Sequence, residues 1–179
     1  MHHFIYAEPA DKDRFSLVLH QQRDSFIWSF ILHTLQGPVY TWRVTKPHGS
    51  SWRLSASGPA AVPESESNIV AVIVVFDFEP QSTARTIRLL DGTCKEVYNT
   101  LMSTSSAELG TLDFEWVTQV SINLNASQII ALTINPTHIC NYATQLANSV
   151  LSERSRGNDF LPVVTIARSF PSPNSEQNT

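Results

Sequence analysis

The sequence predicts an α+β fold, with a mainly antiparallel twisted sheet and two or three helices packed on it. Two observations lead to this prediction. Short runs rich in aromatic and β-branched residues, separated by glycine and proline turns, dominate the first half of the chain. Helical spacing of apolar residues dominates the second half. The 179 residues are 42% hydrophobic, so we expect one globular domain over residues 1–170 and a disordered tail at 171–179.

Five runs in the first half are predicted strands. Residues 15–19 (F-S-L-V-L) form the first, and residues 26–35 form the second because their aromatic and β-branched side chains favour a strand over a buried helix. Residues 39–44 and 51–55 flank T-K-P-H-G-S, which predicts a β-hairpin. Residues 69–76 are apolar at every position, so we expect a central strand covered on both faces.

The second half contains the predicted helices and the remaining strands. Residues 82–103 show helical spacing in two pieces broken at Asp91-Gly92, with Cys94 in the core. Residues 114–124 (F-E-W-V-T-Q-V-S-I-N-L) place apolar side chains mostly on one parity, which predicts a half-buried strand. The apolar run at 160–168 contains a proline and predicts an edge strand.

A further helix is predicted to begin near Pro136, a residue that helices accept in their first turn. Its apolar face consists of Tyr142, Ala143, Leu146, Ala147, Val150 and Leu151. Cys140 lies in the first turn, where the helix dipole and the unpaired N–H groups favour a thiolate. Cys140 is therefore a candidate nucleophile, and the alternative is a small buried packing residue.

A thiol nucleophile needs a base within hydrogen-bond reach. His138 lies two residues before Cys140 and is one candidate. The others come from predicted strands or loops upstream: His20, His33 and His48.

Aromatic residues are the second group of candidate site residues. They line a predicted apolar pocket or, in the alternative, pack in the hairpin and the core. We expect these aromatic side chains to contact a substrate: Trp28, Tyr40, Trp42, Trp52 and Trp116.

Composition and motif spacing argue against several classes of function. The formal net charge is −4 and no basic stripe occurs, so we expect neither a nucleic acid nor a membrane as partner. No ligand spacing for a metal, no Gly-x-Gly-x-x-Gly and no Walker loop is present, so we expect no metal and no cofactor. Two cysteines and no signal-peptide pattern predict a cytoplasmic protein with reduced thiols.

The order of these features resembles a group of small uncharacterised fungal proteins with a permuted NlpC or papain-like layout. The resemblance covers residues 14–151: the strand Y-T-W-R-V-T, a Pro-His-Gly loop, S-W-R-L, the buried strand I-V-A-V-I-V-V and, later, a helix headed by a cysteine. In that layout a strand carrying His-Trp precedes the helix. Cys140 matches the helix cysteine, but Arg14-Phe15 stands where His-Trp is expected, so the resemblance implies a pocket without the usual dyad.

Three hypotheses of function follow. The first is a small-molecule-binding domain acting on an apolar metabolite as a cofactor-independent cyclase or isomerase, a role that such small fungal domains can have in secondary-metabolite biosynthesis. The second is a cysteine-dependent hydrolase or acyl transferase using Cys140 and a histidine. The third is a non-catalytic interaction domain or a homodimer built on an exposed apolar face.

Overall fold

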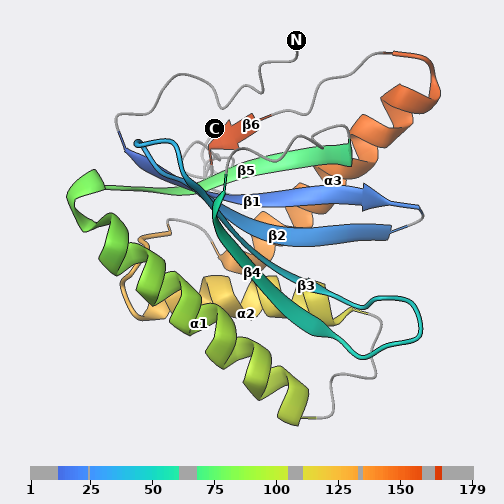
Figure 1. Ribbon diagram of the computed structural model, residues 1–179. Coiled ribbons are helices and arrows are strands. Elements are labelled where there is room, and N and C mark those ends of the chain that lie inside the picture. Colours follow the sequence, from blue (N-terminus) through green and yellow to red (C-terminus); the bar gives the residue numbers. More distant parts are fainter. Residues whose placement is uncertain are drawn as a thin grey trace, which may run out of the picture.

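The computed structural model describes residues 12–23, 25–60, 68–104, 111–132, 135–158 and 164–166. The predicted tail at 171–179 lies outside them. Within the described residues, one six-stranded sheet has the order β4-β3-β2-β1-β5-β6 (Figure 1). Its strands are β1 (Asp13–Gln22), β2 (Ser25–His33), β3 (Val39–Thr45), β4 (Arg53–Ala60), β5 (Ile69–Phe78) and β6 (Val164–Ile166). The helices are α1 (Thr83–Ser103), α2 (Leu112–Ala126) and α3 (Pro136–Ser155), with a 3-10 turn, η2 (Pro80–Ser82), before α1.

The strand pairing confirms the predicted α+β class. Strands β1 to β5 pair with their neighbours in antiparallel fashion, and β6 pairs with β5 in parallel at the edge of the sheet. The predicted hairpin is present as β3 and β4, although β4 begins later and extends further than the sequence indicates. The edge strand expected within 160–168 is present as β6.

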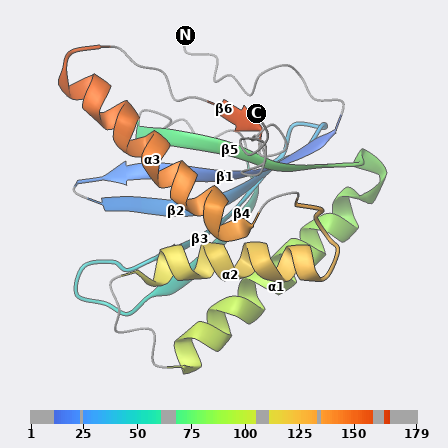
Figure 2. The same cartoon turned by 180° about the vertical axis from the view of Figure 1, so that it is seen from behind.

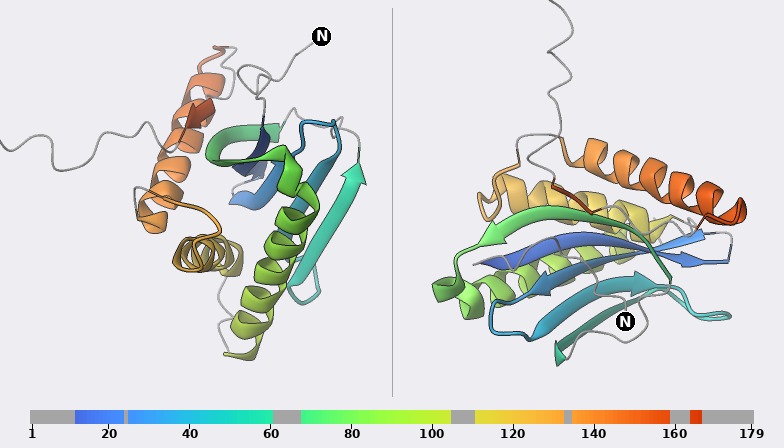
Figure 3. Two further views of the ribbon diagram at one scale, coloured as in Figure 1. Left: turned by 90° about the vertical axis from the view of Figure 1, so that its left-hand side faces the viewer. Right: turned by 90° about the horizontal axis from the view of Figure 1, so that it is seen from above.

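The three helices lie on the same side of the sheet (Figures 2 and 3). Strand alternation sends Phe15, Leu17 and Leu19 of β1 toward the helices, where they join the main core. The ring of Phe15 stacks on Phe30 of β2 with centroids 4.9 Å apart, and Phe30 in turn contacts Trp116 of α2 at 5.6 Å. The helix layer and the sheet therefore share one continuous apolar core.

The other face of the sheet carries a second, smaller apolar cluster: Val18, Ile31, Val39, Ile69 and Val72. Its members come from four strands and are all buried. Strand β5 contributes buried residues to both faces, which confirms that the continuous apolar run at 69–76 is an inner strand.

The strand predicted at 114–124 is wrong, because these residues lie in helix α2. The buried side chains follow helical spacing: Leu112, Trp116, Val117, Val120, Ser121 and Leu124. Val117 and Ser121 lie at positions that the predicted strand would expose. Tertiary packing decides the conformation here. The indole N–H of Trp116 donates to the Cys94 carbonyl of α1 at 3.0 Å, and its ring packs on the sheet.

The predicted break at Asp91-Gly92 is also wrong, because α1 is continuous through both residues. A glycine inside a helix costs only about 1 kcal/mol relative to alanine. Asp91 adds support by pairing with Lys95 one turn later at 2.6 Å and by accepting a hydrogen bond from Trp42 Nε1 at 3.3 Å. Cys94 is fully buried, as predicted, and burial raises the pKa of its thiol.

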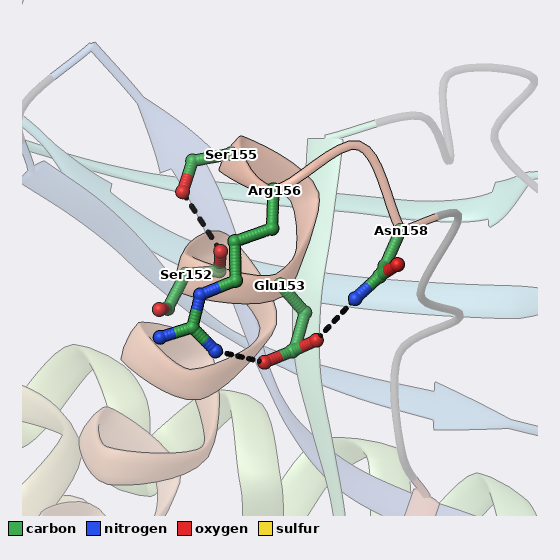
Figure 4. A network of polar contacts seen from close by, with 5 residues as sticks. All are labelled: Ser152, Glu153, Ser155, Arg156 and Asn158. Carbon is green, nitrogen blue, oxygen red and sulfur yellow. Dashed lines mark hydrogen bonds and ion pairs between the residues drawn. The ribbon is translucent and has the colours of Figure 1, made fainter.

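Helix α3 is fixed at both ends. At its start, the Asn135 side chain accepts a hydrogen bond from the Thr137 N–H, with Pro136 in the first turn, as the sequence indicates. At its end, Glu153 accepts hydrogen bonds from Arg156 at 2.7 Å and from Asn158 at 2.6 Å (Figure 4). These contacts cap the two ends of the helix, and the Arg154 guanidinium donates to the Ile69 carbonyl of β5 at 3.1 Å, which ties the end of α3 to the sheet.

Candidate functional site

A cleft of about 990 Å³ opens where the loop between β3 and β4 faces the start of α2 and the first half of α3. Figure 2 shows the first turn of α2 beside that loop. The volume lies at the upper end of the usual range for small-molecule sites. The residues lining it are Gln22, Ser25, Phe26, Ile27, Trp28, Val44, Thr45, Lys46, Pro47, Trp52, Thr111, Asp113, Phe114, Asn141, Thr144 and Gln145.

Aromatic rings from three elements form the walls of this cleft. Trp28 comes from β2 and meets Phe114 of α2 edge to face, with centroids 5.3 Å apart. Trp52 comes from the β3–β4 loop, and the Lys46 ammonium lies 5.8 Å from its ring centroid. Both tryptophans are nearly buried, so their orientations are set by the core behind them. The cleft is thus a partly rigid aromatic pocket.

Asp113 is the acidic residue among the described residues that line the cleft. It lies in the first turn of α2, where one carboxylate oxygen accepts a hydrogen bond from the Phe114 N–H at 3.0 Å. Burial raises the pKa of Asp113 to about 6, and this effect outweighs the backbone hydrogen bonds that lower it. Within the described residues, no basic side chain forms an ion pair with Asp113. A carboxyl group with a pKa this close to neutrality can both accept and donate a proton.

Polar side chains from α3 form the opposite rim. Asn141, Thr144 and Gln145 follow i, i+3 and i+4 spacing, which puts them on one face of the helix. The Thr144 hydroxyl donates to the Cys140 carbonyl at 3.1 Å. The two carboxamides supply donors and acceptors that can orient a bound molecule.

The cleft brings together two of the five predicted aromatic residues. Trp28 and Trp52 line it, whereas Tyr40, Trp42 and Trp116 are not among its lining residues. Trp42 and Trp116 are buried in the main core, and each uses its indole N–H in a hydrogen bond to α1. Tyr40 packs against the same core from the helix-facing side of β3.

The Cys140 thiol lies inside the core and not at the cleft surface. It has no exposed surface, and the hydroxyl of Thr118 donates a hydrogen bond to its sulfur at 3.5 Å. Burial raises the pKa of Cys140, opposite to the lowering expected from its place at a helix start. Removal from water therefore outweighs the hydrogen bond from Thr118, which lowers the pKa of the thiol.

The candidate histidines are dispersed. His48 in the β3–β4 loop and His138 on α3 are exposed. His20 Nε2 and the Ser29 hydroxyl share a hydrogen bond of 3.0 Å. Both residues lie on the face of the sheet that carries the smaller apolar cluster, opposite the helices. Burial, with Arg43 nearby, lowers the pKa of His20 to about 4, and burial with Arg14 nearby does the same for His33. Among the described hydrogen bonds, the partner of the Cys140 thiol is Thr118 and not a histidine.

We expect Cys140 to react slowly with iodoacetamide at neutral pH. With Cys94 replaced by serine, the alkylation rate is expected to stay below that of a free peptide thiol, because the sulfur is buried and its pKa is raised. Timed alkylation followed by mass spectrometry measures this rate. The reaction should speed up in denaturant, which serves as the control for thiol integrity. Alkylation faster than that of a model thiol, with an inflection below the usual pKa, would restore the nucleophile hypothesis.

Sequence reasoning missed Lys46, Phe114 and the polar residues of α3 that line the cleft, and it also missed Asp113. Its signal is an acidic residue in the first turn of an apolar helix, after a threonine at the cap position. That signal is visible only when 112–126 is recognised as a helix, and the alternation of apolar residues hides it.

Among the described residues, no group of three or more His, Cys, Asp or Glu is placed to hold a metal ion. No described helix has the length and apolar character needed to cross a membrane.

Comparisons of the chain with protein-family models, with curated proteins and with solved structures find no match. Function is therefore inferred from the cleft itself.

Proposed function

We propose that this protein binds a small, largely apolar compound in the aromatic cleft and converts it without a cofactor, as a cyclase or isomerase. The cleft carries the proposal. It combines about 990 Å³ of volume with rings from β2, the β3–β4 loop and α2, and it places few ionisable groups among them. Such a composition is typical of sites that recognise apolar molecules by shape and orient them with a few polar groups.

Asp113 supplies the chemistry in this proposal. An isomerisation or ring closure can proceed by moving one proton, with no net change in oxidation state. The Asp113 carboxylate takes the proton from one position of the substrate, and the resulting carboxylic acid returns it to another. In the free protein the pKa of Asp113 is about 6, so its carboxylate can take up a proton near neutral pH. The aromatic walls hold the substrate in a reactive conformation and keep water away from it.

We also propose a fungal biosynthetic role and a cytoplasmic location, and the support for both comes from the sequence alone. The thiol hydrolase or acyl transferase receives no support from the buried Cys140. The homodimer has no specific support either. In the described part of the chain, the exposed large apolar residues are Leu35 in the β2–β3 loop, Leu89 on α1 and Ile122 on α2.

Filling the cleft tests the proposal. Thr144→Trp places a large ring at the rim, and we expect it to weaken binding of the neutral probe 1-naphthalenemethanol by at least about tenfold, because the added ring takes the probe's volume. Isothermal titration calorimetry measures the dissociation constant. Ser149→Trp, on an exposed position of α3, is the matched control and should bind as the unmodified protein does. Equal affinities for all three proteins would place the binding elsewhere and refute the proposal.

A further inference from the structure

Asp113 lines the aromatic cleft and forms no ion pair with any residue that the structure describes. The ion pairs of the described residues join Lys12 to Glu79, Arg14 to Asp77, Lys95 to Asp91 and Arg156 to Glu153, and none includes Asp113. The carboxylate accepts the Phe114 N–H, a neutral donor. A partly buried carboxylate that lacks a cation is costly when ionised, and a cationic ligand would remove much of this cost.

The walls of the cleft also suit a cation. The ammonium group of Lys46 lies over the Trp52 ring, 5.8 Å from its centroid. Tryptophan is the aromatic side chain that attracts cations most strongly, because its ring faces carry negative potential. Lys46 is exposed, and a lysine side chain can change rotamer, so its ammonium group can leave this position when another cation arrives. The protein's own lysine thus occupies a place that a ligand's cation would fill.

We infer that the substrate is an apolar compound bearing a protonated amine, with the ammonium group held between the Asp113 carboxylate and the aromatic walls. This inference rests on the proposed function and names its substrate class. Trp28, Phe114 and Trp52 contact the apolar part and the cation, while Asp113 supplies the opposite charge. Among the described residues that line the cleft, the other charged side chain is Lys46, and it competes with the substrate for the Trp52 face.

Three probes with one ring system and different charges test the inference. They are 1-naphthylmethylamine as the cation, 1-naphthalenemethanol as the neutral compound and 1-naphthoate as the anion. Titration calorimetry at neutral pH should show the amine binding at least about tenfold more tightly than the alcohol, and the carboxylate more weakly than both. Saturation-transfer NMR provides a second measure for the weak ligands.

Three variants separate the contributions of the charges. Asp113→Asn should remove the preference for the amine, so that the dissociation constants of the amine and the alcohol become equal. Glu115→Gln removes the same charge from the same turn of α2 without touching the cleft lining, and it should keep the amine preference. Lys46→Met should strengthen amine binding several-fold, because it removes the competing ammonium group.

The pH dependence has a defined sign. The amine is held by the ionised Asp113, so its preference over the alcohol should be present above pH about 6 and disappear as the carboxyl takes up a proton below it. In the described part of the chain, Lys46 is the other charged group that lines the cleft, and the Lys46→Met variant shows whether it contributes to the profile. This titration on the unmodified protein also covers the case in which a variant does not fold.

The outcomes are distinguishable. Amine and alcohol bound equally, with no pH dependence, would overturn the cation inference and leave the apolar-ligand proposal standing. Tightest binding of the carboxylate would overturn the inference in favour of an anionic substrate paired with Lys46. Binding of none of the three probes would overturn both proposals. A preference for the amine that survives Asp113→Asn would contradict the assigned role of Asp113.

Discussion

Replacing Trp116 with alanine is expected to lower the free energy of unfolding by about 3–5 kcal/mol, the usual cost of removing a buried tryptophan. Trp116 has no exposed surface, its ring contacts Phe30 of the sheet, and its N–H donates to the Cys94 carbonyl of α1. The substitution would therefore open a cavity at the junction of α1, α2 and the sheet. Urea denaturation followed by circular dichroism measures the change.

Two control variants separate the loss of the buried ring from the effect of any substitution in α2. Trp116→Phe keeps most of the ring and should recover much of the loss, leaving about 1 kcal/mol for the missing hydrogen bond and the smaller volume. Ile122→Ala lies on the same helix at an exposed position and should change stability by less than about 0.5 kcal/mol. If Ile122→Ala proved as costly as Trp116→Ala, both residues would have to be buried, as the strand interpretation of 114–124 requires.

Replacing Asp113 with asparagine is expected to stabilise the protein at neutral pH by about 2 kcal/mol. Folding raises the pKa of this carboxyl from 3.8 to about 6, so folding favours its neutral form. A difference of this size corresponds to about 3 kcal/mol, and screening by solvent reduces it to about 2. Asparagine resembles the neutral acid in shape and lacks the costly charge.

The sign of the pH dependence follows from linkage. Below pH about 4 the carboxyl is protonated in both the folded and the unfolded chain, so Asp113→Asn should bring no gain there. The gain should grow between pH about 4 and 6 and stay constant above. Thermal unfolding across this range measures it, with Glu115→Gln as the control for the loss of one charge in the same helix turn. A substitution that destabilises the protein at neutral pH would show that Asp113 supports the fold and is not held at a cost for function.

The sheet was predictable because strand signals are local. Aromatic and β-branched runs, the Pro/Gly hairpin loop and the all-apolar run at 69–76 each point to one conformation, and the structure confirms them. Helix α2 was not predictable in the same way. Its segment is so apolar that both the two-residue and the 3.6-residue period find matches, and contacts of Trp116 with distant parts of the chain decide between them.

The candidate site was predictable only in part. Two residues of the aromatic walls, Trp28 and Trp52, were among the predicted residues because large aromatic side chains commonly line apolar pockets. Which tryptophans face the cleft depends on strand register and on the position of α2, neither of which the sequence shows. Asp113 was missed because the segment that follows it was predicted as a strand. An acid on a solvated strand keeps its ordinary pKa, whereas in the first turn of the half-buried helix α2 burial raises the pKa of Asp113.

The most direct test of the ligand cleft uses the four tryptophans as internal reporters. Protein labelled with 5-fluorotryptophan gives one fluorine resonance for each, assigned by single Trp→Phe substitutions. On addition of 1-naphthalenemethanol, the resonances of Trp28 and Trp52 should shift and saturate together, while those of Trp42 and Trp116 stay in place. Shifts confined to Trp42 and Trp116, or the absence of any shift at saturating probe, would contradict the assignment of this cleft as a ligand site.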